Sequence, residues 1–232
     1  MEERRLSDLA LFQGAREEDI PALLRCLEGE RRQYAKGEYI LRVGERVRRM
    51  GLVLRGGVYV ENDDAWGSRT LLGHVGPGQV FAETYACLPD EPSRVNAVAA
   101  EDTEVLLLNV RRLLAAEGEL CRHSGVLLRN LLTIMAGKNL LLSRRVFYTS
   151  YKSIRGRVLA YLSDQAVLKG SASFRIPFDR QQLADFLGVD RSALSNELSK
   201  LRREGLLAVR KNEFRLLEPQ REFSTPHVEK TF

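Results

Sequence analysis

A short polar stretch near the C-terminal end of the chain carries residue types that can hydrogen-bond to the edges of nucleic-acid bases. Ser192, Asn196, Ser199 and Arg203 fall on one side of a predicted helix, with Arg191 beside them in its first turn. An arginine can give two parallel N–H donors to guanine, and an asparagine can pair with adenine. The small residues between them would let the helix backbone approach the bases. An ordinary solvated helix face has a similar pattern, so the neighbouring elements must decide between the two interpretations.

Those neighbours predict two helices joined by a tight turn and followed by a hairpin. Asp179 and Gln182 have the spacing of a capping box at the start of the first helix. Gly188 permits the backbone angle of a tight turn, and Asp190 is placed to cap the second helix. A polar turn at 210–212 between two short apolar runs predicts a β-hairpin with basic residues at its tip. The second helix has an apolar stripe at the spacing i, i+4 and i+7, formed by Leu194, Leu198 and Leu201.

This arrangement resembles the winged helix-turn-helix of the bacterial cyclic-AMP receptor protein and fumarate-nitrate regulator (CRP/FNR) family, and the resemblance extends over most of the chain. The resemblance implies that the second helix reads bases in the major groove through Arg191, Ser192 and Asn196. Ser192 stands where the receptor has a glutamate, so the receptor's DNA sequence preference does not carry over. The residues expected to face the DNA backbone are Arg180, Gln181, Ser199, Arg203, Arg210 and Lys211.

Composition and charge agree with a DNA-binding module in the C-terminal part. The 232 residues are 44% hydrophobic and 29% charged, which is typical of a folded chain long enough for two compact domains. The net charge is +5, and residues 150–217 hold 13 Lys and Arg against 7 Asp and Glu. Positive charge gathered in one domain is expected of a protein that displaces counterions from phosphate.

The sequence also indicates a compartment. No apolar run approaches the roughly 20 residues of a membrane span, and no apolar signal segment follows the charged first residues. We therefore expect a cytoplasmic protein without a membrane partner. Cys26, Cys87 and Cys121 are far apart and odd in number, which favours reduced thiols over a disulfide framework. The sequence assigns no redox role to Cys87 or Cys121.

Short apolar runs separated by glycine-containing turns fill the part of the chain from about residue 31 to residue 110, and they predict an antiparallel barrel or jelly roll. The turns Gly56-Gly57 and Gly76-Pro77-Gly78 resemble those of the cyclic-nucleotide-binding β-roll of the family. The predicted fold class is therefore α+β. We expect a β-roll with short N-terminal helices over 1–117, a dimerisation helix over 118–149, a winged helix-turn-helix over 150–218 and a disordered tail over 219–232.

A long helical pattern from Glu119 to about Tyr148 carries an apolar stripe in steps of four and three. Such a stripe is typical of a coiled-coil seam, and a helix packed on its own domain would have the same pattern. Because members of the family dimerise through this helix, we expect a homodimer bound to a palindromic operator. Asn139 is the polar residue that would fix the register of the seam. The full seam is Leu128, Leu132, Met135, Asn139, Leu142 and Val146.

The family's cyclic-AMP site uses a Gly-Glu pair for the ribose and an Arg-Ser pair for the phosphate. Here Ala82-Glu83 replaces the first pair, and Ser93-Arg94 stands where the second is expected. A shift of one position along a strand moves a side chain to the other face, which would break the phosphate clamp. We therefore expect a small-molecule effector other than cyclic AMP, of unidentified structure. The expected pocket residues are Glu83, Thr84, Ser93, Arg94, Lys138 and Leu142, the last standing in place of a hydrogen-bonding threonine.

Metal-dependent and enzymatic functions find little support in the residues. The chain has three cysteines, which excludes a self-contained four-cysteine iron–sulfur cluster. Cys121 and His123 are poorly spaced to share a metal on one helix face, so no metal site is expected. With three histidines and without HExxH, GxSxG or GxxxxGK[ST] motifs, the chain is not expected to be an enzyme.

The sequence therefore predicts a sequence-specific regulator of transcription that binds double-stranded DNA and itself, with RNA polymerase as a further partner. The alternative is a nucleotide-sensing regulatory subunit that acts on a protein partner. The predicted wing and recognition helix favour the first function, because a subunit that regulates a protein would have no use for them.

Overall fold

The structure is a computed structural model, and it describes residues 5–63, 69–88, 90–115 and 124–217. The tail predicted over 219–232 lies outside these residues. The chain forms two compact units, and the division between them falls at Ala136 and Gly137. That division lies inside the long helix α4 (Ser124–Thr149), so each unit contains a part of this helix.

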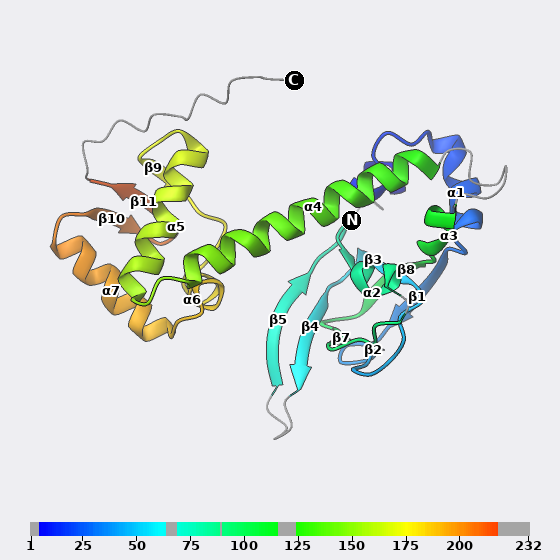
Figure 1. The fold of residues 1–232 in the computed structure, drawn as a ribbon, viewed down its shortest axis with the longest axis horizontal. Helices are drawn as coiled ribbons and strands as arrows, with labels where there is room; N and C mark the ends of the chain where they lie inside the picture. The colour runs from blue at the N-terminus through cyan, green and yellow to red at the C-terminus, as the bar shows by residue number, and fades with distance from the viewer. Residues whose placement is uncertain (1–4, 64–68, 89, 116–123, 218–232) are drawn as a thin grey trace. The chain divides into compact units, whose positions relative to one another are not determined.

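Two antiparallel four-stranded sheets form the framework of the N-terminal unit (Figure 1). In both sheets, strands that are distant in sequence are hydrogen-bonded neighbours, as a β-roll requires. One sheet has the order β1 (Glu30–Tyr34), β8 (Thr103–Leu108), β3 (Met50–Arg55) and β6 (Val80–Phe81). The other has the order β2 (Tyr39–Leu41), β7 (Asn96–Ala99), β4 (Val58–Asp63) and β5 (Arg69–Val75).

Short helices and the first turns of α4 close the core of this unit. Leu11, Phe12 and Leu127 are fully buried in the same apolar cluster as the inner residues of the strands. The Asn130 side chain on α4 donates hydrogen bonds to the carbonyl oxygens of Leu11 at 2.9 Å and Gln13 at 2.8 Å. Among the residues described in this unit, the other helices are η1 (Leu6–Asp8), η2 (Ala10–Phe12), η3 (Glu17–Asp19), α1 (Ile20–Cys26), α2 (Glu83–Cys87) and α3 (Arg111–Ala115).

Glycine at two places in this unit is required by the packing. A Cβ atom on Gly51 of β3 would lie 2.2 Å from the Phe81 ring, so the close approach of β3 and β6 depends on the missing side chain. Gly56, in the turn from β3 to β4, has φ +79°, a conformation that side chains of L-residues disfavour. The predicted Gly56-Gly57 turn is confirmed by this geometry.

The expectation of reduced thiols is wrong for Cys26. Cys26, at the end of α1, is disulfide-bonded, whereas Cys87 on α2 is a free and partly buried thiol. Burial raises the pKa of the Cys87 thiol. The prediction failed because separation along the sequence does not determine separation in space, and pairing depends on the latter.

The C-terminal unit consists of helices packed on a small antiparallel sheet with the order β10-β11-β9 (Figure 1). Its core contains the leucine stripe of α7 together with Tyr148, Tyr161 and Phe214. The predicted α+β class, with a β-roll, a long helix and a winged helix-turn-helix, is confirmed. The elements after α4 are α5 (Ile154–Lys169), β9 (Ser173–Arg175), α6 (Arg180–Leu187), α7 (Arg191–Arg203), β10 (Leu207–Arg210) and β11 (Glu213–Leu216).

Candidate nucleic-acid interface

The start of α6 and the turn after it have the geometry that the sequence predicts. The Asp179 carboxylate accepts the backbone N–H of Gln182 at 2.8 Å, and the Gln182 side chain accepts the backbone N–H of Asp179 at 2.9 Å. This reciprocal pair is the predicted capping box. Gly188 ends α6 with φ +62°, and Asp190 then caps α7. Two helices are thus fixed in a tight helix-turn-helix by local hydrogen bonds.

The helix α7 has one buried face and one exposed face. Leu194, Leu198 and Leu201 are at most 2% exposed and belong to the core of the unit. The opposite face carries Ser192, Asn196, Ser199 and Arg203, with Arg191 beside it in the first turn, and all five predicted DNA-facing side chains lie on the surface. A helix anchored by leucine on one side and lined by small polar residues on the other can lie in a major groove.

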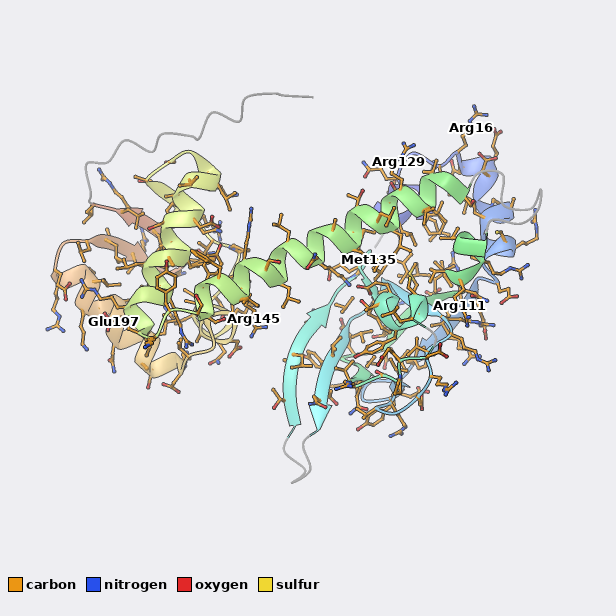
Figure 2. The ribbon with its side chains drawn as sticks, in the orientation of Figure 1. Arg16, Arg111, Arg129, Met135, Arg145 and Glu197 are labelled. Carbon is orange, nitrogen blue, oxygen red and sulfur yellow. The ribbon has the colours of Figure 1, made fainter. Side chains whose placement is uncertain are left out.

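The C-terminal end of α7 is held by an ion pair. The two terminal guanidinium nitrogens of Arg155 on α5 donate to the Glu204 carboxylate, at 3.1 and 2.6 Å. This hydrogen-bonded pair lowers the pKa of Glu204. Arg155 also lies 4.0 Å from Glu197, which is labelled on α7 in Figure 2. The pair fixes the far end of the exposed helix relative to α5.

The hairpin after α7 brings basic residues beside the starts of both helices. Its turn lies between the paired residues Arg210 and Glu213, and Lys211 has φ +55°. Asn212 ties the turn to the segment before α6 through two hydrogen bonds with the Ile176 backbone, at 3.0 and 3.1 Å. The result is a groove of about 700 Å³ lined by Pro177, Asp179, Arg180, Gln181, Gln182, Arg191, Lys211 and Asn212.

Several residues predicted to face phosphate have intramolecular partners. The Arg180 guanidinium lies 5.8 Å from the centre of the Phe214 ring and donates to the Lys211 carbonyl at 3.3 Å. Burial lowers the pKa of Arg180. Gln181 donates to the Asp185 carboxylate, and the Ser199 hydroxyl donates to the Ser195 carbonyl, both at 2.9 Å. Arg203, Arg210 and Lys211 expose their side chains at the surface, as a phosphate contact requires.

Sequence reasoning missed two arginines that hold α6. Arg145, labelled near the C-terminal end of α4 in Figure 2, donates to the carbonyl oxygens of Asp185 at 3.0 Å and Phe186 at 3.1 Å. Arg157 on α5 donates to the carbonyl oxygens of Leu187 at 3.1 Å and Gly188 at 2.9 Å. Four carbonyls at the end of α6 are therefore bound by guanidinium groups, and the positive charges suit the negative end of the helix dipole.

A buried tyrosine on α4 makes a further contact between this helix and the rest of the C-terminal unit. Tyr148 is 2% exposed, and its hydroxyl is hydrogen-bonded to Asp164 on α5. Burial, followed by that hydrogen bond, raises the pKa of Tyr148. Its ring packs edge-on against Tyr161 at 5.5 Å. The final turns of α4 are thus part of the DNA-facing unit, which the sequence pattern of a continuous apolar stripe did not reveal.

The residues of the predicted seam lie along one stripe of α4. Leu132, Leu142 and Val146 are 59%, 60% and 61% exposed, and Asn139 is also exposed. Leu128 is partly buried, and Met135, labelled in Figure 2, packs against the core of the N-terminal unit. The start of the predicted helix before Ser124 lies outside the described residues.

The expected effector residues fall into two groups. Glu83 and Ser93 are buried, at 6% and 2% exposure, whereas Thr84 and Arg94 are not. The Tyr85 hydroxyl accepts the backbone N–H of Arg94 at 3.3 Å, which joins α2 to the segment before β7. Lys138 and Leu142 are exposed on the part of α4 that belongs to the C-terminal unit.

No cluster of three or more potential metal ligands occurs among the residues that the structure describes. The pair Cys121 and His123 lies outside them. His74 packs on the backbone: a Cβ atom on Gly57 would lie 2.4 Å from its Nε2, and its ring lies 5.4 Å from that of Tyr59.

Comparisons with known proteins agree with this geometry. Residues 31–116 match the cyclic nucleotide-binding domain family, and residues 156–221 match the Crp-like helix-turn-helix domain family. The cyclic AMP receptor protein of Thermus thermophilus is 29% identical over 198 residues, 85% of this chain and 87% of that protein.

Two solved structures share the fold. The structure of CprK complexed with OCPA has a TM-score of 0.64 at 19% identity, covering 87% of this chain and 92% of that one. The global regulator CLP of Xanthomonas campestris, described as c-di-GMP responsive, has a TM-score of 0.58 at 19% identity, covering 88% and 100%. With a β-roll that matches the cyclic nucleotide-binding domain family, a long helix and a Crp-like helix-turn-helix in this order, the chain belongs to the CRP/FNR family of transcription regulators.

Proposed function

We propose that the protein acts as a homodimer that binds a palindromic operator sequence-specifically and responds to a small effector in its β-roll. The observation that carries the DNA-binding proposal is the groove shared by three elements. These are the start of α6, the start of α7 and the turn between β10 and β11, which is the tip of the wing. A base-reading candidate, Arg191, and a phosphate-facing candidate, Lys211, line the same groove. A duplex seated there would meet both kinds of contact at once.

The homodimer is supported by the exposed apolar stripe of α4. Leu132, Leu142 and Val146 each expose more than half of their surface, which is costly for a single helix in water. Pairing two copies along this stripe would cover these side chains and present two recognition helices to paired half-sites. RNA polymerase is the further partner that a regulator bound at an operator would meet.

The apolar character of α4 also raises the question of whether this helix spans a membrane. By length and composition α4 could cross a membrane. Arg129 and Lys138 interrupt its apolar sequence, Leu131 lies in the core of the N-terminal unit and Tyr148 lies in that of the C-terminal unit. A helix whose two ends belong to folded units of this kind suits a dimer seam better than a bilayer. We therefore propose a cytoplasmic location.

The DNA-binding proposal is tested by distinguishing residues that contact bases from residues that contact phosphates. Replacing Arg191 by alanine should cost about 1 to 3 kcal/mol on the cognate site and relax the preference at one symmetric pair of base positions. Replacing Lys211 by alanine should weaken binding to all sequences alike and reduce the salt slope by about one unit. Binding to a cognate and a scrambled duplex is measured at several salt concentrations.

Lys211→Ala is a clean substitution because both residues are L-amino acids at the same φ of +55°, so the backbone strain is unchanged. The roles assigned here are reversed if Arg191→Ala lowers both affinities equally and Lys211→Ala changes selectivity. An absence of sequence-selective binding by the unaltered protein at low salt would reject the DNA-binding function itself.

The effector proposal rests on the state of the Ser93-Arg94 pair. The Ser93 hydroxyl is within hydrogen-bond distance of both the carbonyl oxygen and the N–H of Val95, at 2.7 and 3.2 Å. A hydroxyl bound in this way to the backbone two residues on, in the segment before β7, is poorly placed to hold a cyclic phosphate, and the Arg94 side chain stands one position further along. Glu83 remains buried, so a polar ligand of another shape is the expected occupant.

Calorimetric titration of the purified protein with cyclic AMP should therefore show no binding at micromolar concentration. A thermal-shift screen of other nucleotides and small metabolites should identify the effector, since a ligand at about 100 times its Kd adds about 2.7 kcal/mol of stability. Micromolar or tighter binding of cyclic AMP would contradict this proposal.

A further inference from the structure

The hydroxyl of Ser192, in the first turn of α7, is engaged by the residue that caps the helix. Its Oγ lies 2.5 Å from Oδ1 of Asp190. The same Oδ1 accepts the backbone N–H groups of Ser192 at 2.8 Å and Ala193 at 3.0 Å. An ionised carboxylate offers only acceptors, so the proton between the two oxygens is supplied by the serine. The distance is that of a charge-assisted O–H···O⁻ hydrogen bond.

The charge on Asp190 makes this assignment of the proton firm. The Ser192 hydroxyl, followed by the two backbone N–H groups, lowers the pKa of Asp190 below its usual value. The carboxylate is therefore ionised at neutral pH. If the Ser192 hydroxyl pointed its proton at another group, it would lose its charge-assisted hydrogen bond to Asp190. Such a bond is about twice as strong as one between neutral groups.

This hydrogen bond determines whether the Ser192 hydroxyl acts as a donor or as an acceptor toward DNA. A free serine hydroxyl can donate or accept and therefore pairs with any base edge. With its proton on Asp190, Ser192 presents only oxygen lone pairs to a partner in the groove. On the major-groove edges of bases, adenine N6 and cytosine N4 are donors, whereas guanine O6 and N7 and thymine O4 are acceptors.

We propose that Ser192 reads DNA solely as a hydrogen-bond acceptor and selects an adenine or cytosine through its exocyclic amine. The inference rests on the proposed function, in which the exposed face of α7 enters the major groove. It assigns to the N-cap Asp190 an additional role as a positioning residue, which sets the donor and acceptor character of its neighbour without touching DNA itself.

The test requires base analogues, because every Watson–Crick pair contains one major-groove amine and base exchange alone changes donors and acceptors together. An operator is first selected with the full-length protein from a randomised duplex library. The base position at which Ser192→Ala relaxes the preference is then identified. At that position, adenine is replaced by purine, or cytosine by pyrimidin-2-one, so that only the amine is lost. A 7-deazapurine in the same base pair removes an acceptor instead.

The unaltered protein should lose about fivefold in affinity when the amine is removed, the effect of one net hydrogen bond. Ser192→Ala should show no such loss, and the 7-deazapurine should leave both affinities within about twofold. Asp190→Thr provides the second variant, since threonine also caps helices but has no carboxylate to hold the serine proton. In this variant the penalty for removing the amine should shrink, and a penalty for the 7-deazapurine should emerge.

The outcomes separate this inference from the function on which it rests. If no sequence is enriched from the library, DNA reading by α7 fails and the role of Ser192 falls with it. If an operator is enriched, but the amine penalty persists in Ser192→Ala or the unaltered protein is sensitive to the 7-deazapurine instead, the acceptor assignment is wrong and the DNA-binding function stands.

Discussion

Replacing Leu132 and Leu142 together by aspartate is expected to convert the protein into monomers and to weaken operator binding by about a hundredfold or more. Both leucines are exposed on α4, at 59% and 60%, within the stripe proposed as the dimer seam. Two pairs of carboxylates in this seam would be desolvated next to like charges, which pairing of the helices cannot offset. Separate monomers lose the gain of two linked half-site contacts, typically about 10² to 10⁴ in affinity.

Leu141→Asp is the matched control. Leu141 is 55% exposed on the same helix and lies on the opposite side from the stripe, so its replacement adds a charge without entering the seam. Sedimentation of the two variants gives the oligomeric state, and titration of an operator duplex gives the affinity. A double variant that sediments as a dimer would show that the seam lies elsewhere.

Gly56→Ala should destabilise the N-terminal unit by about 3 kcal/mol, since it combines backbone strain with a steric clash. Gly56 has φ +79°, and a Cβ atom there would lie 2.6 Å from both the Asp102 carbonyl oxygen and the Thr103 hydroxyl. That hydroxyl lies within hydrogen-bond distance of the backbone of Gly57 and is buried. The β3–β4 turn and the start of β8 are therefore packed too closely to accommodate an added methyl group.

Gly37→Ala isolates the strain from the clash. Gly37 has φ +83°, and a Cβ atom there would have no neighbour within 4 Å, so about 1 kcal/mol is expected. Thermal unfolding followed by circular dichroism should show a midpoint lowered by roughly 10 °C for Gly56→Ala and by roughly a third of that for Gly37→Ala. Equal midpoints for the two variants would mean that the turn relaxes around the added methyl group.

The parts of this fold that were predictable are those specified by neighbours in sequence. The capping box of Asp179 and Gln182, the turn at Gly188 and the leucine stripe of α7 depend on residues within a few positions of one another, and each can be read from spacing. The class of the β-roll was predictable from its glycine-punctuated strands. The resemblance to a known family supplied the expected roles of the surface residues.

What could not be predicted depends on contacts with backbone atoms or with distant segments. Arg145 and Arg157 bind carbonyl groups 30 to 41 positions away along the chain. Because every residue has a backbone carbonyl, the residue types do not reveal such partners. The disulfide bond of Cys26 was missed for the same reason. The partner of the Ser192 hydroxyl, although two positions away, became visible only once the rotamers of both side chains were known.

The binding of Arg145 to the end of α6 has a consequence for recombining this protein with its relatives. A DNA-reading module cut from the chain at the end of α4, just before Ser153 caps α5, would leave behind Arg145 and Tyr148. The C-terminal carbonyls of α6 would then keep Arg157 and lose the other guanidinium. The exchangeable segment begins upstream of these contacts, near Gly137, where the helix passes from one compact unit to the other.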